Sequence, residues 1–326
     1  MQTMRAVVLE RACSALELRL TTVPIPTVTP GWVLVAVKAF GINRSELYMR
    51  TVEANAPHIQ LPRIPGIECV GEVADPSDSG LRKGQRVVAL MGGMGRSFDG
   101  SYAEYALLPS SHVFAADVDW PWETTAAIPE TYFTAYGSLF DCLQLEPGDR
   151  LLVRGATSAL GLAAVQLAKS IGCTVLGTSR QPSRLEFLRT HGVDCPLLDD
   201  SDLDARVRTF HPGGIDKILE LVGPATLRQS MSWLAYHGVA CCTGVLGHQF
   251  AVEAFDPIRF IPNGVYLSSF FSNFPTQGRI DAILAHLAAR QLRPVISRVF
   301  RFDEIGQAHE LMESDGGVGK IVVSVS

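Results

Sequence analysis

Residues Leu151–Arg180 read LLVRGATSALGLAAVQLAKSIGCTVLGTSR, and this stretch decides the fold. An apolar run is followed by a turn of small residues, by a segment with apolar residues at helical spacing, and by a second apolar run. Gly172 stands where a glycine commonly ends a helix. The order strand, turn, helix, strand predicts the start of a dinucleotide-binding fold.

The turn itself departs from the usual G-x-G-x-x-G pattern, because Ala156 and Ser158 stand where glycine is expected. All its residues except Thr157 and Leu160 are small, so the backbone can still approach a pyrophosphate. Ser158 either binds the phosphate or caps the following helix. We therefore expect the cofactor to contact a set of turn residues: Ala156, Thr157, Ser158, Ala159, Leu160 and Gly161.

The end of the second strand predicts which cofactor is bound. NAD sites place an acid about 20 residues after the turn, where it bonds the ribose 2′-hydroxyl. No acid occurs between Gly161 and Glu186, and the strand ends instead in Ser179 and Arg180, with Arg184 one turn later. Because arginine pairs with a phosphate and an acid repels it, this pattern favours NADPH. The alternative is that both arginines are solvated surface charges.

The rest of the chain predicts two domains of different class. The first 120 residues or so hold short β-branched runs separated by glycine and proline, which indicates a compact β-rich domain. From Glu123 onward strands alternate with helices, as in a doubly wound parallel sheet. Strand-like runs after the last α/β unit indicate that the chain returns to the first domain. We expect residues 1–122 and 276–326 to form one domain, and residues 123–275 the cofactor domain.

Composition excludes several classes of protein. The 326 residues are 47% hydrophobic and 19% charged, with a net charge of -5, which gives no basic surface for nucleic acid or anionic membrane. No apolar run is long enough to span a membrane, and no signal segment is evident, so we expect a cytoplasmic protein. The seven cysteines include no C-x-x-C pair, which argues against a structural zinc site.

Several motifs in order along the chain resemble one family. They are AFGINRSELYMR (Ala39–Arg50), PRIPGIECVGEV (Pro62–Val73), FDGSYAEYALLP (Phe98–Pro109), AAIPETYFTAY (Ala126–Tyr136) and GGVGKIVV (Gly316–Val323). Together they resemble the medium-chain dehydrogenase/reductase superfamily, and within it the zinc-independent quinone oxidoreductase (zeta-crystallin-like) branch. The resemblance implies a GroES-like catalytic domain built from both ends of the chain, with a Rossmann NADP(H)-binding domain inserted.

The same resemblance predicts that no metal is bound. Zinc-dependent members of the superfamily have a thiolate and a histidine at positions that match Asn43 and Ile67 here, and neither residue is a credible zinc ligand. A reaction without a Lewis acid favours acceptors that need little activation, such as quinones and activated alkenes.

The resemblance also implies roles for particular residues. Tyr48 and Asn43 are the expected catalytic residues, Tyr48 as a donor to the acceptor oxygen and Asn43 as an amide that bonds the ribose or a substrate carbonyl. The alternatives are an interior aromatic and a turn-forming residue. For Lys320 a structural role and a cofactor contact stay open. The remaining expected cofactor contacts are Thr134, Gly223, Gly244, Val245, Leu246, Ser269, Phe270 and Lys320.

Three functions remain open from the sequence: an NADPH-dependent quinone reductase, an NADPH-dependent enone or enoyl reductase, and a non-enzymatic NADPH-binding protein. The expected partner is a small-molecule electron acceptor, with neither nucleic acid nor membrane involved. GVYLSSFF (Gly264–Phe271) reads as an edge strand of the cofactor domain. Because such edges invite pairing, we expect a homodimer through it.

Overall fold

A computed structural model describes residues 2–314 and 316–325 of the chain. The chain forms two compact units, unit 1 (residues 1–133 and 272–326) and unit 2 (residues 134–271). The sequence predicts the first division after residue 122, whereas the structure divides the chain after Phe133. The difference arises because α2 (Trp122–Ala126) packs against the strands of unit 1, and α3 (Pro129–Tyr136) bonds to that unit through its first residues.

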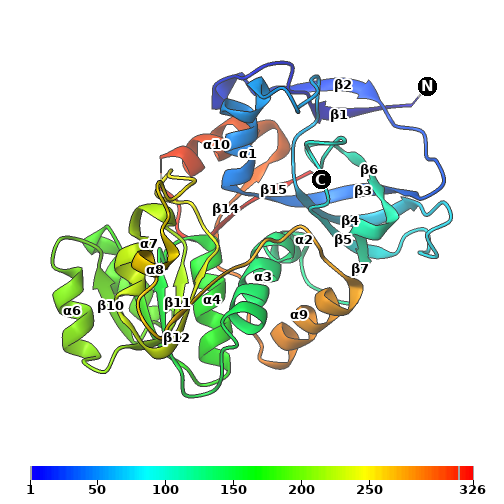
Figure 1. Ribbon diagram of the computed structural model, residues 1–326. Coiled ribbons are helices and arrows are strands. Elements are labelled where there is room, and N and C mark those ends of the chain that lie inside the picture. The colour runs from blue at the N-terminus through cyan, green and yellow to red at the C-terminus, as the bar shows by residue number, and fades with distance from the viewer. Residues whose placement is uncertain (1, 315, 326) are drawn as a thin grey trace. The chain divides into compact units, whose positions relative to one another are not determined.

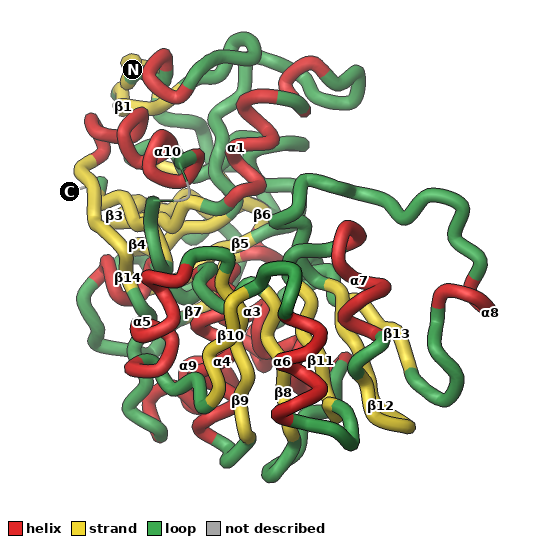
Figure 2. Tube along the Cα trace, turned by 90° about the vertical axis from the view of Figure 1, so that its left-hand side faces the viewer, coloured by secondary structure: helices red, strands yellow, loops and turns green. Residues whose placement is uncertain are grey.

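Unit 2 is built on a six-stranded sheet in which every neighbouring pair is parallel. Its strands are seen side by side in Figure 2. In sheet order they are β10 (Cys195–Leu198), β9 (Thr174–Ser179), β8 (Arg150–Arg154), β11 (Ile215–Glu220), β12 (Leu234–Cys242) and β13 (Tyr266–Ser269). This arrangement confirms the predicted doubly wound parallel sheet. The sequence does not predict β10, because the strand is only four residues long and contains Pro196. A proline is tolerated there because β10 is an edge strand.

The central strands β8, β9 and β11 are buried along most of their length, as parallel strands usually are when helices cover the sheet. The apolar side chains of α6 and α7 form one hydrophobic cluster with those of β8, β9 and β11, while α4 packs on β8 and β9. Figure 1 shows these helices around the sheet. The helices of unit 2 are α4 (Ala159–Ser170), α5 (Leu185–Thr190), α6 (Leu203–Phe210), α7 (Pro224–Met231), α8 (Pro257–Phe260), the π-helical turn η4 (Gly137–Cys142) and the 3-10 turn η5 (Pro182–Arg184).

Unit 1 contains a seven-stranded, mainly antiparallel sheet and a separate two-stranded one. The central strand β3 (Trp32–Ile42) pairs with β4, β6 and β15. The other strands are β1 (Thr3–Val7), β2 (Leu20–Pro24), β4 (Glu68–Asp75), β5 (Arg86–Leu90), β6 (Tyr105–Pro109), β7 (Val113–Ala115), β14 (Ile296–Arg301) and β15 (Lys320–Ser324). Since β15 pairs with β3, the chain does return to complete the first domain, as the sequence predicts.

Helices of unit 1 position the polar residues described below. α1 follows β3 directly, and α10 packs against β14 and β15. Their bounds, with that of the remaining helix, are α1 (Arg44–Thr51), α9 (Gln277–Ala289) and α10 (Ile305–Glu313). In the described part of the chain no helix has the length and apolar character needed to cross a membrane.

Candidate functional site

The predicted phosphate turn lies between β8 and α4. Gly155 has a φ of +88°, a conformation that glycine adopts without strain. The turn is tied to β9 because the Gly155 amide donates to Thr178 Oγ1 at 3.1 Å and the Ala156 amide donates to the Thr178 carbonyl at 3.0 Å. The turn therefore starts from a fixed position at the carboxyl edge of the sheet.

Ala156 does not obstruct this turn. Its side chain is fully buried, and a Cβ added to Gly177 of β9 would lie 3.0 Å from the Ala156 Cβ, so the methyl group packs into the interior. At Gly161 an added Cβ would lie 2.7 Å from both the Ala156 Cα and the Gly155 carbonyl oxygen. The glycine that the sequence retains is thus the one that lets α4 approach the turn closely.

Ser158 caps α4. Its hydroxyl accepts from the Gly161 amide at 3.0 Å and donates to the Gly155 carbonyl at 2.9 Å. Of the two roles that the sequence leaves open, the structure shows the cap. The first N–H groups of a helix have no acceptor within it, and together with the helix dipole they favour an anion. The turn and the start of α4 therefore fit a nucleotide pyrophosphate.

The end of β9 carries the residues predicted to select the cofactor. Ser179 is only 5% exposed, and its hydroxyl accepts from the Gln181 amide at 3.1 Å. Arg180 is exposed, and Arg184 is half-buried immediately before α5. Arg180 is thus the first residue after β9, the strand whose end lies beside the ribose in folds of this kind, and Arg184 follows four residues later, at the end of a 3-10 turn.

Loops after β11 and β12 come together with the phosphate turn. A Cβ added to Gly223 would lie 2.5 Å from the Gly244 carbonyl oxygen, and one added to Gly155 would lie 3.0 Å from Leu246 Cδ1. The Leu246 amide donates to the Leu221 carbonyl at 3.0 Å. The structure therefore brings Gly223, Gly244 and Leu246 to the carboxyl edge of the sheet, where Val245 accompanies them in the chain.

Thr134, Ser269 and Phe270 lie around η4. Thr134 is 4% exposed, and its carbonyl accepts from Ser138 Oγ at 2.7 Å. The Ser138 and Thr243 hydroxyl oxygens are 2.9 Å apart, which connects η4 to the loop after β12. The ring of Phe270 packs against η4, and the Ser269 carbonyl accepts from a thiol of the same turn. These three residues form a second group, joined to the first through Thr243.

Unit 1 holds a buried polar cluster around Lys320. The ammonium lies 2.6 Å from Glu68 Oε1, and it donates to Asn43 Oδ1 at 2.5 Å and to Thr131 Oγ1 at 2.9 Å. Asn43 Nδ2 donates to the same oxygen of Glu68 at 2.8 Å. An ammonium has three donors, and all three have partners here. This favours the structural role for Lys320 over the predicted cofactor contact.

Glu46 completes the cluster, although it is not among the site residues predicted from the sequence. Its carboxylate accepts from the Asn43 amide at 3.0 Å and from the Ile67 amide at 3.1 Å. Burial, and then the charge of Glu68, raise the pKa of Glu46 to about 7, while Lys320 acts in the opposite direction. Asn43 precedes α1 and Glu46 follows it by three residues, which is the spacing of a capping box and the signal that points to Glu46.

The two predicted catalytic residues both belong to this region of unit 1. Asn43 is the N-cap of α1, and Tyr48 lies on the helix with its side chain half-buried. The partners of Asn43 fix the orientation of its amide: the oxygen faces the Lys320 ammonium, which can only donate, and the nitrogen faces the Glu68 carboxylate, which accepts. Its Nδ2 retains one N–H beyond the bond to Glu68.

Family models and a curated relative both match this chain over most of its length. Residues 29–118 match the model of the alcohol dehydrogenase GroES-like domain, and residues 159–289 match that of the zinc-binding dehydrogenases. The quinone oxidoreductase of Lama guanicoe is 30% identical over 92% of this chain and 90% of that protein.

Solved structures show the same fold. An NAD-dependent alcohol dehydrogenase superposes with a TM-score of 0.88 at 25% identity, over 99% of this chain and 100% of that one. A crotonyl-CoA carboxylase/reductase, AntE, solved in complex with NADP, gives a TM-score of 0.87 at 22% identity, over 99% and 95%.

The residues of this chain do not fit the zinc that the name of one matching family implies. Ile67 has no donor atom, and the Asn43 amide and Glu68 carboxylate are already bound to the Lys320 ammonium, whose charge opposes a second cation. Within residues 2–314 and 316–325, no group of three or more His, Cys, Asp or Glu residues is arranged to hold a metal ion.

The matches together support an oxidoreductase that uses a nicotinamide cofactor. The fold, the phosphate turn and the extent of the similarity agree over nearly the whole chain. The chain belongs to the medium-chain dehydrogenase/reductase superfamily, in its quinone oxidoreductase-like branch.

Proposed function

We propose that the protein is an NADPH-dependent reductase that transfers hydride to a quinone-type acceptor without a metal ion. The observation that carries the choice of NADPH is the end of β9. The strand closes with Ser179, Arg180 follows it, and no acid occurs in the chain between Gly161 and Glu186. A carboxylate there would repel a 2′-phosphate, whereas a guanidinium pairs with it through two parallel hydrogen bonds.

Residues of unit 2 are proposed to hold the cofactor. The N–H groups at the start of α4 bind the pyrophosphate, and Arg180 binds the 2′-phosphate. The loops of Gly223 and Gly244–Leu246 line the carboxyl edge of the sheet, where ligands of such folds bind. When bound, NADPH supplies the hydride that reduces the acceptor.

Residues of unit 1 are proposed to act on the acceptor. The Asn43 amide oxygen is held by Lys320, so the group that Asn43 can offer to a ligand is its remaining Nδ2 hydrogen. Asn43 therefore acts as a donor, toward an acceptor oxygen or a ribose hydroxyl. The Tyr48 phenol donates to the oxygen on which negative charge develops as the acceptor is reduced.

Equilibrium binding and turnover test this proposal together. Dissociation constants for NADPH and NADH are measured on the wild type, on Arg180→Ala and on Arg189→Ala, a control that removes an exposed arginine of α5 paired with Glu186. We expect Arg180→Ala to weaken NADPH by about 1.5–3 kcal/mol, the range for a hydrogen bond to a charged group. NADH should be nearly unaffected, and Arg189→Ala should match the wild type.

Equal losses for both cofactors in Arg180→Ala contradict the assignment of the 2′-phosphate site. Turnover is followed by loss of NADPH absorbance in the presence of a chelator, with a benzoquinone, an enone, an enoyl thioester and an aldehyde. If the enone or the enoyl thioester is reduced faster than the benzoquinone, the function is alkene reduction and not quinone reduction. Tight NADPH binding without turnover of any acceptor favours a binding protein. The cytoplasmic location stays a prediction from the sequence.

A further inference from the structure

Arg154 is a buried arginine at the last position of β8, and it is not among the site residues that the sequence predicts. It is 3% exposed. Nε and Nη2 donate to the two carboxylate oxygens of Asp199 at 2.9 and 2.8 Å. Nη2 also donates to Gln229 Oε1 at 2.9 Å, and Nη1 donates to Ser230 Oγ at 3.0 Å and to the Thr226 carbonyl at 3.4 Å. All five N–H donors of the guanidinium are thus used inside unit 2, so Arg154 has none left for a ligand.

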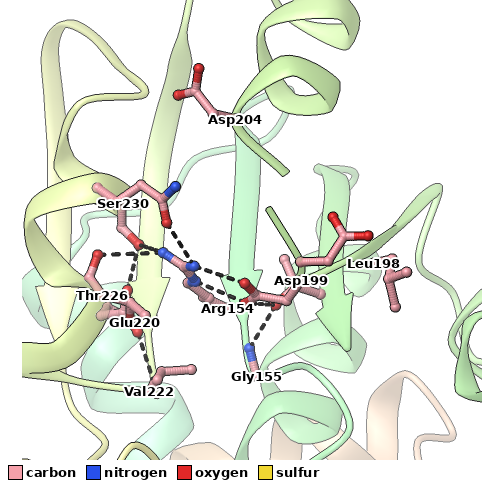
Figure 3. A network of polar contacts seen from close by, with 12 residues as sticks. Arg154, Gly155, Leu198, Asp199, Asp204, Glu220, Val222, Thr226 and Ser230 are labelled. Carbon is pink, nitrogen blue, oxygen red and sulfur yellow. Dashed lines mark hydrogen bonds and ion pairs between the residues drawn. The ribbon is translucent and has the colours of Figure 1, made fainter. Parts of the chain in front are cut away.

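Asp199, the ion-pair partner, lies beside the end of β9. It is the first residue after β10, and its amide donates to the Ser179 carbonyl at 2.9 Å. Its Oδ2 also accepts from the Thr178 hydroxyl at 3.2 Å. Asp199 is therefore bound to Thr178 and Ser179, the two residues that precede Arg180. Folds of this kind hold the adenosine ribose at this end of the strand. Figure 3 shows Arg154 directed at this carboxylate, with Gly155 close by.

Asp199 places a negative charge at the end of β9, where the 2′-phosphate of NADPH is proposed to bind. The end of β9 has no acid in its own sequence, but Asp199, directly after the neighbouring strand β10, places a carboxylate beside it. A carboxylate at this edge that lacked a counter-ion would oppose the two negative charges of a 2′-phosphate, and the low dielectric of a buried position would strengthen the repulsion. The side chain of Asp199 is 13% exposed and that of Arg154 is 3% exposed, so solvent screens the pair weakly.

Glu220 is a second carboxylate in the same network, and it is bound differently. It is fully buried, Oε2 accepts from the Ser230 hydroxyl at 2.5 Å, and Oε1 accepts from the Val222 and Gly223 amides at 2.8 and 3.0 Å. Burial raises the pKa of Glu220. Ser230 stands between this carboxylate and Arg154, as Figure 3 shows, so the charge that Arg154 pairs with directly is that of Asp199.

We propose that Arg154 determines cofactor specificity without touching the cofactor, because it neutralises Asp199 and so permits a 2′-phosphate at the end of β9. Arg154 is in this sense a positioning and charge-compensating residue, and Asp199 is a latent determinant of NADH preference. The inference rests on the proposed use of NADPH, and it deepens that proposal by naming what allows the phosphate.

Four variants test the charge argument through binding alone. NADPH and NADH dissociation constants are measured for the wild type, Arg154→Met, Asp199→Asn, the double variant and Arg150→Met. The last is the control for loss of an arginine from β8, since Arg150 pairs with Asp216 at 2.6 Å at the opposite end of the strand, where the two side chains are 33% and 30% exposed. We expect Arg154→Met to shift the ratio of the two constants toward NADH by about tenfold or more, the scale of a nearby uncompensated charge.

Asp199→Asn should shift the ratio in the opposite direction, toward NADPH, because it leaves the positive charge of Arg154 in excess. The double variant should return close to the wild-type ratio, and Arg150→Met should leave it unchanged. A purely structural role of Arg154 in holding the turn would weaken both cofactors alike, and that result overturns the proposal. An unchanged ratio in Asp199→Asn overturns it as well.

If Arg154→Met does not fold, Arg154→Lys and Asp199→Asn carry the test. The lysine variant keeps the charge but loses the paired hydrogen bonds, so it should keep the wild-type ratio even if its melting temperature falls. A wild type that prefers NADH refutes the proposed use of NADPH. The shifts of the NADPH/NADH ratio in Arg154→Met and Asp199→Asn can still be measured in that case. Failure of the proposed function and failure of the charge compensation by Arg154 are therefore distinguishable.

Discussion

The ammonium of Lys320 lies 2.6 Å from a carboxylate oxygen of Glu68, and neither side chain is more than 2% exposed. The two residues are brought together by the pairing of β15 with β3 and of β3 with β4. A Cβ added to Gly41 of β3 would lie 2.3 Å from Lys320 Cε and 2.5 Å from Glu68 Oε1. The glycine in GIN is therefore what makes room for a buried ion pair at this place.

Removing the ammonium should be strongly destabilising. Lys320→Met leaves Glu68 buried without a cation, and we expect a loss of about 3–5 kcal/mol in the free energy of unfolding. Denaturant titration measures it, with Lys38→Met as the control, since Lys38 pairs with Glu72 at the surface at 3.3 Å and should contribute at most about 1 kcal/mol. Adding Glu68→Gln to Lys320→Met should recover part of the loss. Equal effects of the two lysine variants would contradict the importance of the buried pair.

Glu46 should make stability depend on pH in an identifiable window. Its pKa is about 7 in the folded protein and near 4.5 when exposed, so the folded state binds the proton more tightly. This contribution is fully present below about pH 4.5 and is lost as pH rises to about 7, by an amount of about 3 kcal/mol. His309 acts in the opposite sense, because burial lowers its pKa to about 3. The measurement is therefore the difference in unfolding free energy between wild type and Glu46→Gln from pH 4.5 to pH 8, and a constant difference would contradict the assignment.

Gly161 should not accept even a methyl group. The added Cβ of Gly161→Ala would meet the Ala156 Cα and the Gly155 carbonyl oxygen at 2.7 Å, and neither backbone atom can move without shifting the turn. We expect a loss of about 1–3 kcal/mol in stability, together with weaker binding of NADPH. Gly278→Ala in α9 is the control, because no atom lies within 4 Å of its added Cβ. Thermal melting and cofactor titration of both variants decide the point, and a Gly161→Ala protein that matches the control would refute it.

Tyr48→Phe tests the proposed donor to the acceptor. The change removes only the hydroxyl, and we expect kcat for the preferred acceptor to fall about a hundredfold, as is typical when a positioned proton donor is lost. The dissociation constant of NADPH should stay at the wild-type value, which separates a role in the reaction from a general disturbance. Wild-type kcat in this variant would remove Tyr48 from the mechanism.

The open edge of unit 2 underlies the proposed homodimer. β13 ends the sheet and pairs with β12 on one side, and Tyr266 on it is 56% exposed. We expect light scattering to give twice the mass of 35.3 kDa at micromolar concentration. Tyr266→Lys should shift the mass toward the monomer, because symmetric pairing of the edge would bring the added charges together. Phe210→Lys, on an exposed residue of α6, is the control. A monomeric wild type contradicts the proposal.

Local sequence determined the core of the cofactor domain. The apolar runs and the turn of residues 151–180 predict β8, α4 and β9. A parallel strand that is buried on both faces needs apolar side chains at consecutive positions, so it is visible in the local sequence. The same stretch locates the phosphate turn and Arg180. Family resemblance located Asn43 and Tyr48, since their surrounding motif is continuous in the chain.

Only the tertiary structure decided which charges meet. Arg154 pairs with Asp199 across β9, and β10, which Asp199 follows, is too short and too irregular in sequence to be predicted. Lys320 finds Asn43 and Glu68 from the far end of the chain. The energy of a buried charge depends on its neighbours in space and not on its neighbours in sequence. The sequence therefore determined the sheet, the turn and the cofactor class to expect, and the packing of distant strands determined which acids are neutralised beside them.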